Sequence, residues 1–338
     1  MGLFGMFSND IAIDLGTANT LIYMKGKGIV LDEPSIVTFD VGTRKIVAIG
    51  EESKKMMGRV HKELNTIRPM KDGVIADFEI AEGMLRLFIK QISSNWMPAR
   101  RIVVCVPSGI TEVEKRAVRD TAEHAGAKEV YLISEPMAAA IGIGLDVFAP
   151  YGNMIVDIGG GTTEIAVIAL SGITNGVSIR VAGDELTESV VRYFRANHNI
   201  LIGERTAEEI KCQVGSVMPL KEEVIIEVKG RDLVAGVPKV TEVSSIEIRE
   251  ALNAPVTQMV EAIKVAMEKT APELAADILD RGIFLTGGGA LLKGLDERIR
   301  TETGVPVHVA EDPLTAVARG TGKVLEDLDK YRKVMIKR

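Results

Sequence analysis

Cysteine, tryptophan and aromatic residues in general are scarce in this sequence of 338 residues. Its two cysteines, Cys105 and Cys212, lie far apart in the chain, which supports neither a disulfide framework nor a thiolate metal site. A reducing cytoplasm is therefore the expected compartment. Aromatic residues make up 4% of the chain, and 41 basic residues are outnumbered by 47 acidic ones. Because stacking side chains and a basic stripe are both missing, no nucleic acid partner is expected.

Long apolar runs are also missing. No uncharged apolar run approaches the roughly 18 residues that a membrane-spanning helix requires, and the N-terminal MGLFGMF lacks the length and positive flank of a signal peptide. We therefore expect the protein to stay inside the cell. The hydrophobic share of 46% is enough for two cores, and two are expected because single cores stop growing near about 250 to 300 residues.

What the chain does contain is one arrangement of residues twice. IAIDLGTANTLIY (11–23) has the layout of MIVDIGGGTTEIAV (154–167): an apolar strand, an aspartate, a turn with glycine and a second strand. EPMAAAIG, beginning at Glu135, matches DPLTAVARG, beginning at Asp312, with an acid, a proline and a helix of small residues that permits close packing. The repeat predicts two similar α/β domains, 1–145 and 146–338, each a mixed sheet covered by helices.

The duplicated turns carry the functional prediction. VDIGGGTTE alone favours an ordinary glycine hairpin and a phosphate-binding turn about equally, and it matches neither familiar phosphate loop, because both of those open a helix. Two such turns can face each other across a cleft, where a polyphosphate would accept N–H bonds from both. Asp14 and Asp157 would then hold a hydrated Mg²⁺ against it. The remaining alternative is the duplication of a purely structural hairpin.

Local signals predict several helix boundaries. Thr111 and Glu114 have the spacing of a capping box, and so do Thr206 and Glu209. An apolar stripe predicts a helix through 256–267, and another helix is expected to start at Pro272 and to be closed by Gly282. From the residues alone, Glu208 and Lys211 are interpreted as a solvated ion pair one turn apart.

At these residues the sequence resembles the actin and sugar-kinase ATPase superfamily, and more closely its MreB-like bacterial actins. The resemblance runs from SNDIAIDLGTANTLIY through RPMKDGVIADF, EPMAAAIG, VDIGGGTTE and LTGGGALLKGLD to AEDPLTAVARGTGKVLE. It implies a duplicated ribonuclease-H-like actin fold, α/β in class, with the nucleotide in the cleft between the two domains. It also implies an inserted subdomain near 33–66 in the first domain and a larger one near 180–241 in the second.

The resemblance implies the site residues as well. ATP or ADP would contact Thr17, Ala18, Asn19, Gly159, Gly160, Gly161, Thr162, Glu208, Glu209, Ile210, Lys211, Gly287, Gly288, Gly289 and Ala290. Asp14 and Asp157 would organise Mg²⁺ through water. Glu135 would orient or deprotonate the attacking water with help from the hydroxyl of Thr162. The alternative for Glu135 is a helix-capping acid ahead of Pro136, and Asp312 is expected to have only that structural role. Glu164 has no assigned role.

The function implied is that of an ATP-dependent bacterial cytoskeletal protein. Its membrane-associated filaments, expected as paired protofilaments, would organise cell-wall synthesis and maintain rod shape, with slow ATP hydrolysis coupled to polymerisation. Its partners would be copies of itself, the inner face of the cytoplasmic membrane and cell-wall elongation proteins. A small-molecule kinase or a nucleotide-binding scaffold that forms no filaments is the alternative.

Membrane attachment is expected through exposed apolar residues. Leu3, Phe4, Met6 and Phe7 near the N-terminus, with Trp96 and Met97 in SSNWMPARR, would insert into one leaflet, and Arg100 and Arg101 would meet anionic head groups. The alternative is that these apolar side chains fold back onto their own domain.

Overall fold

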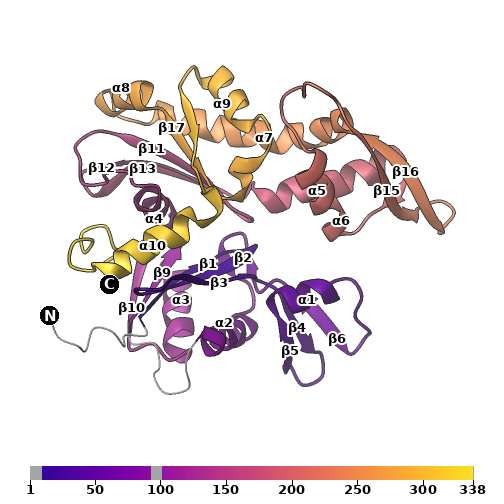
Figure 1. Cartoon of the computed structure of the whole chain (residues 1–338), viewed down its shortest axis with the longest axis horizontal. Coiled ribbons are helices and arrows are strands. Elements are labelled where there is room, and N and C mark those ends of the chain that lie inside the picture. The colour runs from indigo at the N-terminus through magenta and orange to yellow at the C-terminus, as the bar shows by residue number, and fades with distance from the viewer. Residues whose placement is uncertain (1–9, 93–100, 338) are drawn as a thin grey trace.

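The computed structural model describes residues 10–92 and 101–337 (Figure 1). The residues predicted to insert into a membrane, namely Leu3, Phe4, Met6, Phe7, Trp96 and Met97, lie outside these ranges, as does Arg100. Within the ranges, no helix combines the length and the apolar character needed to cross a bilayer.

The described chain contains two five-stranded sheets of the same topology. The first has the order β10-β9-β1-β2-β3 and is built from β1 (Ile11–Leu15), β2 (Asn19–Met24), β3 (Gly28–Pro34), β9 (Arg101–Val106) and β10 (Glu129–Ser134). The second has the order β13-β12-β11-β17-β18 and is built from β11 (Asn153–Ile158), β12 (Thr163–Ala169), β13 (Gly172–Ile179), β17 (Ile283–Thr286) and β18 (Val307–Val309).

Strand directions match between the sheets. The first two strands of each sheet form an antiparallel hairpin, and the fourth strand runs parallel beside the first. The fifth strand then runs parallel beside the fourth. Parallel neighbours require helical crossovers, which cover the sheet faces. The α/β class and the duplication expected from the two aspartate-containing hairpins are confirmed.

Amphipathic helices bury one face against each sheet. On the first sheet lie α2 (Phe78–Ile92) and α3 (Glu112–His124), and α2 contributes Met84 and Phe88, both 0% exposed, to the core. On the second lie α7 (Ser245–Glu268), α8 (Pro272–Arg281) and α9 (Leu295–Thr303), and α5 (Gly183–Tyr193) packs against α7. Apolar residues at helical spacing place a continuous stripe on one side of each helix, so each sheet has a core of its own.

Two small-residue helices join the halves. α4 (Glu135–Gly142) and α10 (Ala316–Glu326) lie against each other between the two sheets (Figure 1). Although α4 belongs to the first half it contacts β11 and β12, and α10 of the second half contacts β1 and β2. A Cβ on Gly142 would overlap the carbonyl oxygen of Ala316, and one on Gly320 would overlap that of Ala138. The close packing predicted for these helices is confirmed.

Each half also carries a small sheet at its outer end, to the right in Figure 1. In the first half, β4 (Val37–Asp40), β5 (Ile46–Ile49) and β6 (Leu64–Ile67) pack with α1 (Gly50–Met56). In the second half, β14 (Ile200–Leu201), β15 (Ile225–Asp232) and β16 (Pro238–Ser244) lie near α6 (Glu204–Val214), after a short π-helix, η2 (Phe194–His198). The two outer ends face each other across an opening.

The helix boundaries test the local sequence signals. Thr111 and Glu114 make the reciprocal hydrogen bonds of a capping box at α3, and α8 runs from Pro272 to Arg281 with Gly282 after it. The predicted stripe at 256–267 lies within α7. The predicted capping pair at the start of α6 is wrong: the helix begins at Glu204 after Gly203, without a side-chain cap. The glutamate expected to cap it, Glu209, pairs with Arg205 one turn away.

Candidate functional site

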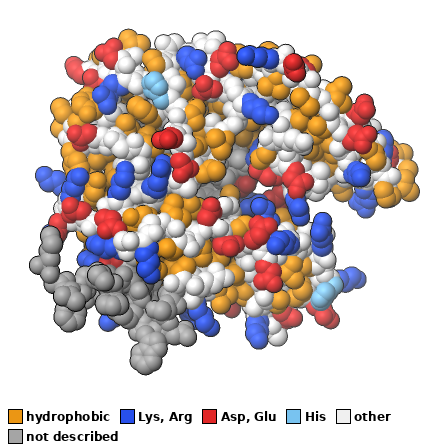
Figure 2. Space-filling view, viewed as in Figure 1, with side chains coloured by type: hydrophobic (Ala, Val, Ile, Leu, Met, Phe, Trp, Pro, Cys, Tyr) orange, Lys and Arg blue, Asp and Glu red, His pale blue; other side chains and the backbone are white. Residues whose placement is uncertain are grey.

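A cavity of about 580 Å³ opens between the two halves. It is the hollow at the right of the space-filling view, bordered by acidic and basic side chains (Figure 2). The volume lies in the range of about 300–1,000 Å³ that is usual for small-molecule sites. Both duplicated turns line it, together with the segments after β17 and at the start of α5 and α6.

The two duplicated turns meet inside the cavity. Gly160 lies so close to the β1–β2 turn that a Cβ on it would come within 2.8 Å of Ala18 Cβ and 3.1 Å of Ala18 N. A Cβ on Gly161 would lie 2.7 Å from the hydroxyl oxygen of Thr17. Glycine is required here because the two backbones approach each other closely. The hairpins are therefore opposed, as the prediction of a phosphate clamp requires.

The first turn of α5 supports the glycine turn. Gly183 N–H donates to the carbonyl of Gly159 at 3.1 Å, and Asp184 N–H donates to the carbonyl of Gly160 at 2.8 Å. These bonds occupy the carbonyl side of the turn. Within the described ranges, the N–H groups of Gly160 and Gly161 donate to no protein acceptor. Free N–H groups in a glycine turn form an anion-binding concavity.

A third segment reaches the same point from the first half. β7 (Met70–Lys71) and β8 (Val74–Ile75) form a small hairpin with Asp72 and Gly73 at positive φ angles of 52° and 77°. Gly73 N–H donates to the hydroxyl of Thr17 at 3.1 Å, and a Cβ on Gly73 would lie 3.0 Å from Thr162 Cγ2. This hairpin packs against both duplicated turns and lines the cavity beside them.

Each sheet has one aspartate near the end of its first strand, Asp14 in β1 and Asp157 in β11, and both line the cavity. Burial raises the pKa of Asp14 from 3.8 to about 6, with a further contribution from Asp32, although the Cys105 thiol donates to Asp14 at 3.2 Å. Burial also raises the pKa of Asp157 from 3.8 to about 7, against a hydrogen bond of 2.8 Å from the hydroxyl of Thr286. The raised values mean that the described protein surroundings compensate these two charges poorly.

Two glutamates add to this negative charge. Glu135 is the first residue of α4 and lines the cavity, and burial raises its pKa well above the usual value, with Glu164 the largest charged contributor. Ser134 is the N-cap of α4 and Glu135 is its first helical residue, so Glu135 does not occupy the N-cap position. Glu164 is fully buried and accepts hydrogen bonds from Ser108 N–H at 3.0 Å and from the Ser178 hydroxyl at 2.6 Å.

Glu164 is thus a buried acid near Glu135 to which no role could be assigned from the sequence. Ser108 follows β9 of the first half, whereas Glu164 and Ser178 belong to β12 and β13 of the second. The carboxylate therefore joins the two halves directly behind the cavity. In the sequence, Glu164 only continues an apolar strand, and nothing there shows which donors meet it.

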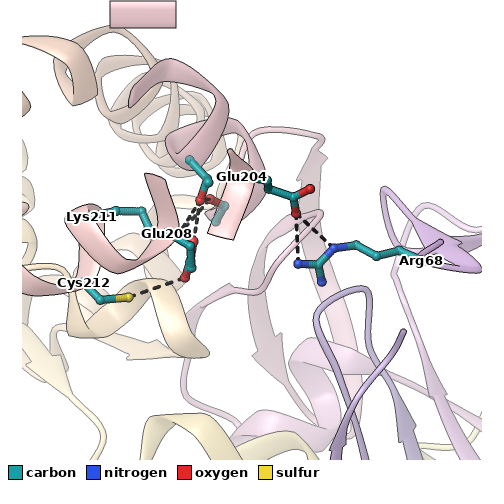
Figure 3. A network of polar contacts seen from close by, with 7 residues as sticks. Arg68, Glu204, Glu208, Lys211 and Cys212 are labelled. Carbon is teal, nitrogen blue, oxygen red and sulfur yellow. Dashed lines mark hydrogen bonds and ion pairs between the residues drawn. The ribbon is translucent and has the colours of Figure 1, made fainter. Parts of the chain in front are cut away.

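The opposite end of the cavity is formed by α5 and α6 (Figure 3). Glu208 Oε2 lies 2.5 Å from Lys211 Nζ and accepts from the Thr187 hydroxyl at 2.5 Å, and its Oε1 accepts from the Cys212 thiol at 3.5 Å. Lys211 also donates to the carbonyl of Gly183 and to Thr187, each at 3.0 Å. The pair predicted from the residues alone is present, but its members also fasten α6 to α5.

One ion pair spans the cavity mouth. Arg68, which follows β6 of the first half, donates to Glu204 at the start of α6 at 3.0 Å (Figure 3). The two side chains are 27% and 53% exposed, so the pair contributes at most about 1 kcal/mol. Its position matters more than its strength, because it connects the outer ends of the two halves.

Most predicted site residues lie around this cavity. Its lining includes Asp14, Thr17, Ala18, Asn19, Glu135, Asp157, Gly159, Gly160, Gly161, Thr162, Glu208, Lys211, Gly287, Gly288 and Gly289. Three others do not line it. Glu209 pairs with Arg205, and Ile210 and Ala290 are 3% and 5% exposed within the second core. Asp312 is outside the lining too, and its carboxylate accepts from the hydroxyl of Thr315.

Several residues that line the cavity were not predicted from the sequence. Lys54, Arg68, Asp184 and Glu204 all line the cavity. Two weak signals in the sequence could have indicated a site residue. Arg68 begins the RPMKDG segment, and Asp184 follows a glycine where a helix starts. Ordinary surface charges in turns and first helical turns look the same.

Arg101 forms an ion pair within the first half. Its guanidinium binds the carboxylate of Asp10, with a distance of 2.9 Å from Nε, and Asp10 is completely buried. The Arg101 side chain is 34% exposed. Its charge is paired at the edge of the first sheet, which gives Arg101 a structural contact there, and its role at anionic head groups stays a prediction.

The sequence matches proteins of known type along almost its whole length. The profile of the family described as MreB/Mbl protein matches residues 8–333. The cell shape-determining protein MreB of Escherichia coli (strain K12) is 56% identical over 333 residues, covering 97% of this chain and 96% of the relative. The cell shape-determining protein Mbl of Bacillus subtilis (strain 168) is 50% identical over 329 residues, covering 97% and 99%.

Solved structures agree with these sequence matches. The crystal structure of MreB 5 of Spiroplasma citri bound to AMPPNP has a TM-score of 0.92 and 36% identity, covering 97% of this chain and 98% of that one. The MamK double helical filament has a TM-score of 0.78 at 23% identity, covering 94% and 99%, and this likeness concerns the fold alone. The predicted actin-like fold is confirmed.

Proposed function

The chain belongs to the MreB/Mbl family of actin-like cytoskeletal proteins, and on this basis we propose that it binds ATP or ADP in the cavity between its halves, hydrolyses ATP and assembles into filaments. The observation that carries the proposal is the meeting of the two duplicated turns inside one cavity, with the free N–H groups of Gly160 and Gly161. The Spiroplasma citri relative, whose crystal structure holds AMPPNP, supports a nucleotide as the occupant.

The acids around the phosphate end fit a hydrated Mg²⁺. Asp14 is half-buried and Asp157 is buried, both have raised pKa values, and the charged neighbours that shift them furthest are other acids. In the described ranges, no group of three or more His, Cys, Asp or Glu side chains is arranged to hold a metal ion by itself, which suits binding through water and phosphate oxygens. When bound, the ion would neutralise charge on the phosphates.

The chain's own residues would then position and activate water. Glu135 begins α4 at the cavity wall, and its raised pKa makes its carboxylate a stronger base toward an attacking water. Thr162, in the glycine turn and 6% exposed, offers a hydroxyl on the same wall. The Gly160 and Gly161 N–H groups would bind phosphate oxygens as negative charge moves during the transfer.

Filament assembly is tested directly by electron microscopy and sedimentation of the purified chain with and without ATP. A heterologous contact between copies generates an open filament, and MamK, which shares the fold, is known as a double helical filament. ATP-dependent filaments, with release of phosphate, would support the proposal. Monomers whose ATP turnover depends on a sugar would favour the small-molecule kinase, and monomers that bind ATP without turnover would favour the scaffold.

Attachment to the inner face of the cytoplasmic membrane is a further part of the proposal, as is work with cell-wall elongation proteins. Leu3, Phe4, Met6, Phe7, Trp96 and Met97 support it through their apolar character in the sequence. Sedimentation with anionic liposomes should decrease for the double variant Trp96→Ser and Met97→Ser. Leu279→Ser, which removes an exposed apolar side chain from α8, is the matched control. Unchanged binding of the double variant would contradict a role for Trp96 and Met97.

A further inference from the structure

Each of the two aspartates at the phosphate end of the cavity receives a hydrogen bond from the neighbouring parallel strand. The Cys105 thiol on β9 donates to Asp14 Oδ1 at 3.2 Å, and the Thr286 hydroxyl on β17 donates to Asp157 Oδ1 at 2.8 Å. Both donors are buried, with exposed fractions of 3% and 0%. Neither donor lines the cavity, whereas both aspartates do. The donors therefore contact the aspartates from behind the cavity wall.

The two donors stand at the same place in the duplicated fold. In chain order β9 and β17 are the fourth strands of their sheets, and each runs parallel beside the strand that carries the aspartate. In the second sheet the aspartate and the threonine are directly paired. In the first, Ile13 is paired with Val104, so the residues that follow them, Asp14 and Cys105, are neighbours too. One strand register thus brings a short donor side chain to each aspartate.

These hydrogen bonds limit how the two carboxylates can turn. The terminal torsion of an aspartate is broad, so an unheld carboxylate rotates easily. Among the described residues, the Oδ1 atoms of Asp14 and Asp157 accept these bonds while their Oδ2 atoms accept none, which leaves Oδ2 available to the water shell of a cation. Hydrogen bonds behind the groups that surround a metal ion orient those groups, and losing one typically costs about tenfold to a hundredfold in metal affinity.

The two donors differ in strength. A thiol is a weaker donor than a hydroxyl, and a thiol in buried surroundings keeps its proton at neutral pH. Cys105 therefore holds Asp14 while withdrawing little of its charge, and the Thr286 hydroxyl makes the stronger bond to Asp157. Serine can replace either donor, whereas alanine and valine cannot, so substitution separates the hydrogen bond from the packing of the side chain.

We propose that Cys105 and Thr286 are a matched pair of positioning residues, which orient Asp14 and Asp157 toward the water shell of the Mg²⁺ that accompanies the nucleotide. This inference rests on the proposed nucleotide function. It gives the buried thiol a role in cation binding, and it makes the Mg²⁺ site depend on the strand pairs β1–β9 and β11–β17 as well as on the aspartates.

The first test measures the Mg²⁺ concentration that gives half-maximal ATP binding, by titration of the full chain below its assembly concentration. Cys105→Ala, which removes the donor, should raise this concentration about tenfold, the lower end of the range for such a bond. Thr286→Val keeps the side-chain shape without the donor and should raise it at least as much. Cys105→Ser and Thr286→Ser keep a hydroxyl and should restore most of the wild-type affinity for Mg²⁺.

Val103→Ala is the matched control for lost packing. Val103 lies on β9 two residues before Cys105, is completely buried and belongs to the same hydrophobic cluster. This variant should lower the urea midpoint and leave the Mg²⁺ requirement at its wild-type value, because no hydrogen bond to an aspartate is removed.

The infrared S–H stretching band of Cys105 gives a second test that depends on no destabilised variant. The band is assigned by its absence in Cys105→Ser, which separates it from that of Cys212, the other cysteine of the chain. With ATP bound, adding Mg²⁺ should move the band to higher frequency. The cation draws charge from the Asp14 carboxylate, which then accepts more weakly from the thiol.

Three results would overturn the inference: an unchanged Mg²⁺ requirement in folded Cys105→Ala or Thr286→Val, a loss in Cys105→Ser as large as in Cys105→Ala, or an S–H band that does not respond to Mg²⁺. If the wild-type chain bound no ATP at any Mg²⁺ concentration, the proposed nucleotide function would fail instead, so the two failures are distinguishable.

Discussion

Glu135 is the residue on which the proposed hydrolysis depends. It begins α4 without acting as a cap, and it faces the cavity with a pKa raised by burial and by the neighbouring acids. Glu135→Gln keeps the shape but removes the base. Phosphate release should therefore fall about a hundredfold or more, the usual contribution of a general base, while the Kd for ATP changes only a few-fold.

A phosphate-release assay beside a binding titration checks this prediction. Asp312→Asn changes the acid at the duplicated position, which lies outside the cavity lining and accepts from Thr315, and it should leave release unchanged. Full release by Glu135→Gln together with intact ATP binding would show that another group activates the water.

The charge of Glu164 influences the proposed base, Glu135. It is the leading charged contributor to the raised pKa of Glu135. In Glu164→Gln that repulsion is lost, so the pKa of Glu135 should fall and its carboxylate should stay ionised to lower pH. The acidic limb of the pH profile of phosphate release should accordingly move to lower pH, measured at saturating Mg·ATP. If the acidic limb stayed in place or moved to higher pH, Glu164 would not control the pKa of Glu135 during hydrolysis.

At the scale of elements, the crossing of α4 and α10 depends on glycine. Replacing a glycine inside a helix by alanine ordinarily stabilises the helix by about 1 kcal/mol. Gly320→Ala should do the opposite, because its Cβ would overlap the carbonyl oxygen of Ala138 and force the helices apart. We expect a loss of about 1–3 kcal/mol or more in the free energy of unfolding, the usual cost of overpacking.

Urea titration of the nucleotide-free chain measures this loss. Gly42→Ala is the control, since its Cβ would meet only the side chain of Asp40 at 3.5 Å, an ordinary contact, and its effect should stay within about 0.5 kcal/mol. If Gly320→Ala proved as stable as the wild type, the crossing would have to be looser than the structure describes.

At the scale of the whole molecule, the opposed halves bring buried acids together at the cavity. Folding raises the pKa of Asp14 from 3.8 to about 6 and that of Asp157 from 3.8 to about 7. Between the unfolded and folded values the folded chain binds more protons, so stability must fall as pH rises. The contribution of the two protonated aspartates to stability is fully present below the unfolded pKa of 3.8. It is lost as the pH rises through the folded values.

The nucleotide-free chain should therefore lose a few kcal/mol of stability between about pH 4 and pH 7, because each tenfold change in a proton affinity corresponds to about 1.4 kcal/mol. Urea midpoints measured across this range with a chelator present test it. Asp157→Asn should flatten the dependence because it removes one of the two titrating groups. Saturating Mg·ATP should also flatten it, because the bound cation compensates the charge of the buried carboxylates. Midpoints that rose steadily to about pH 7 would contradict the prediction.

Several predictions succeeded because their signals are local or repeated. The capping box of Thr111 and Glu114 concerns residues three apart, so its geometry follows from the helix itself. The same spacing at Thr206 and Glu209 failed, because the helix starts earlier, at Glu204. Ile210 is expected to contact the nucleotide together with its neighbours in the sequence. Successive side chains of a helix point to different faces, however, and the Ile210 side chain packs into the core.

The duplication, the α/β class and the two aspartate-containing turns could be predicted from the residues, because apolar periodicity and repeated glycine turns are properties of neighbouring residues. Which charges meet depends on the folded chain. Glu164 accepts from Ser108 across the two halves, Arg68 pairs with Glu204 across the cavity mouth, and Glu208 contacts Lys211, Thr187 and Cys212. Such pairings join residues from separate sheets and helices, whose distances are set by how the two cores pack around α4 and α10.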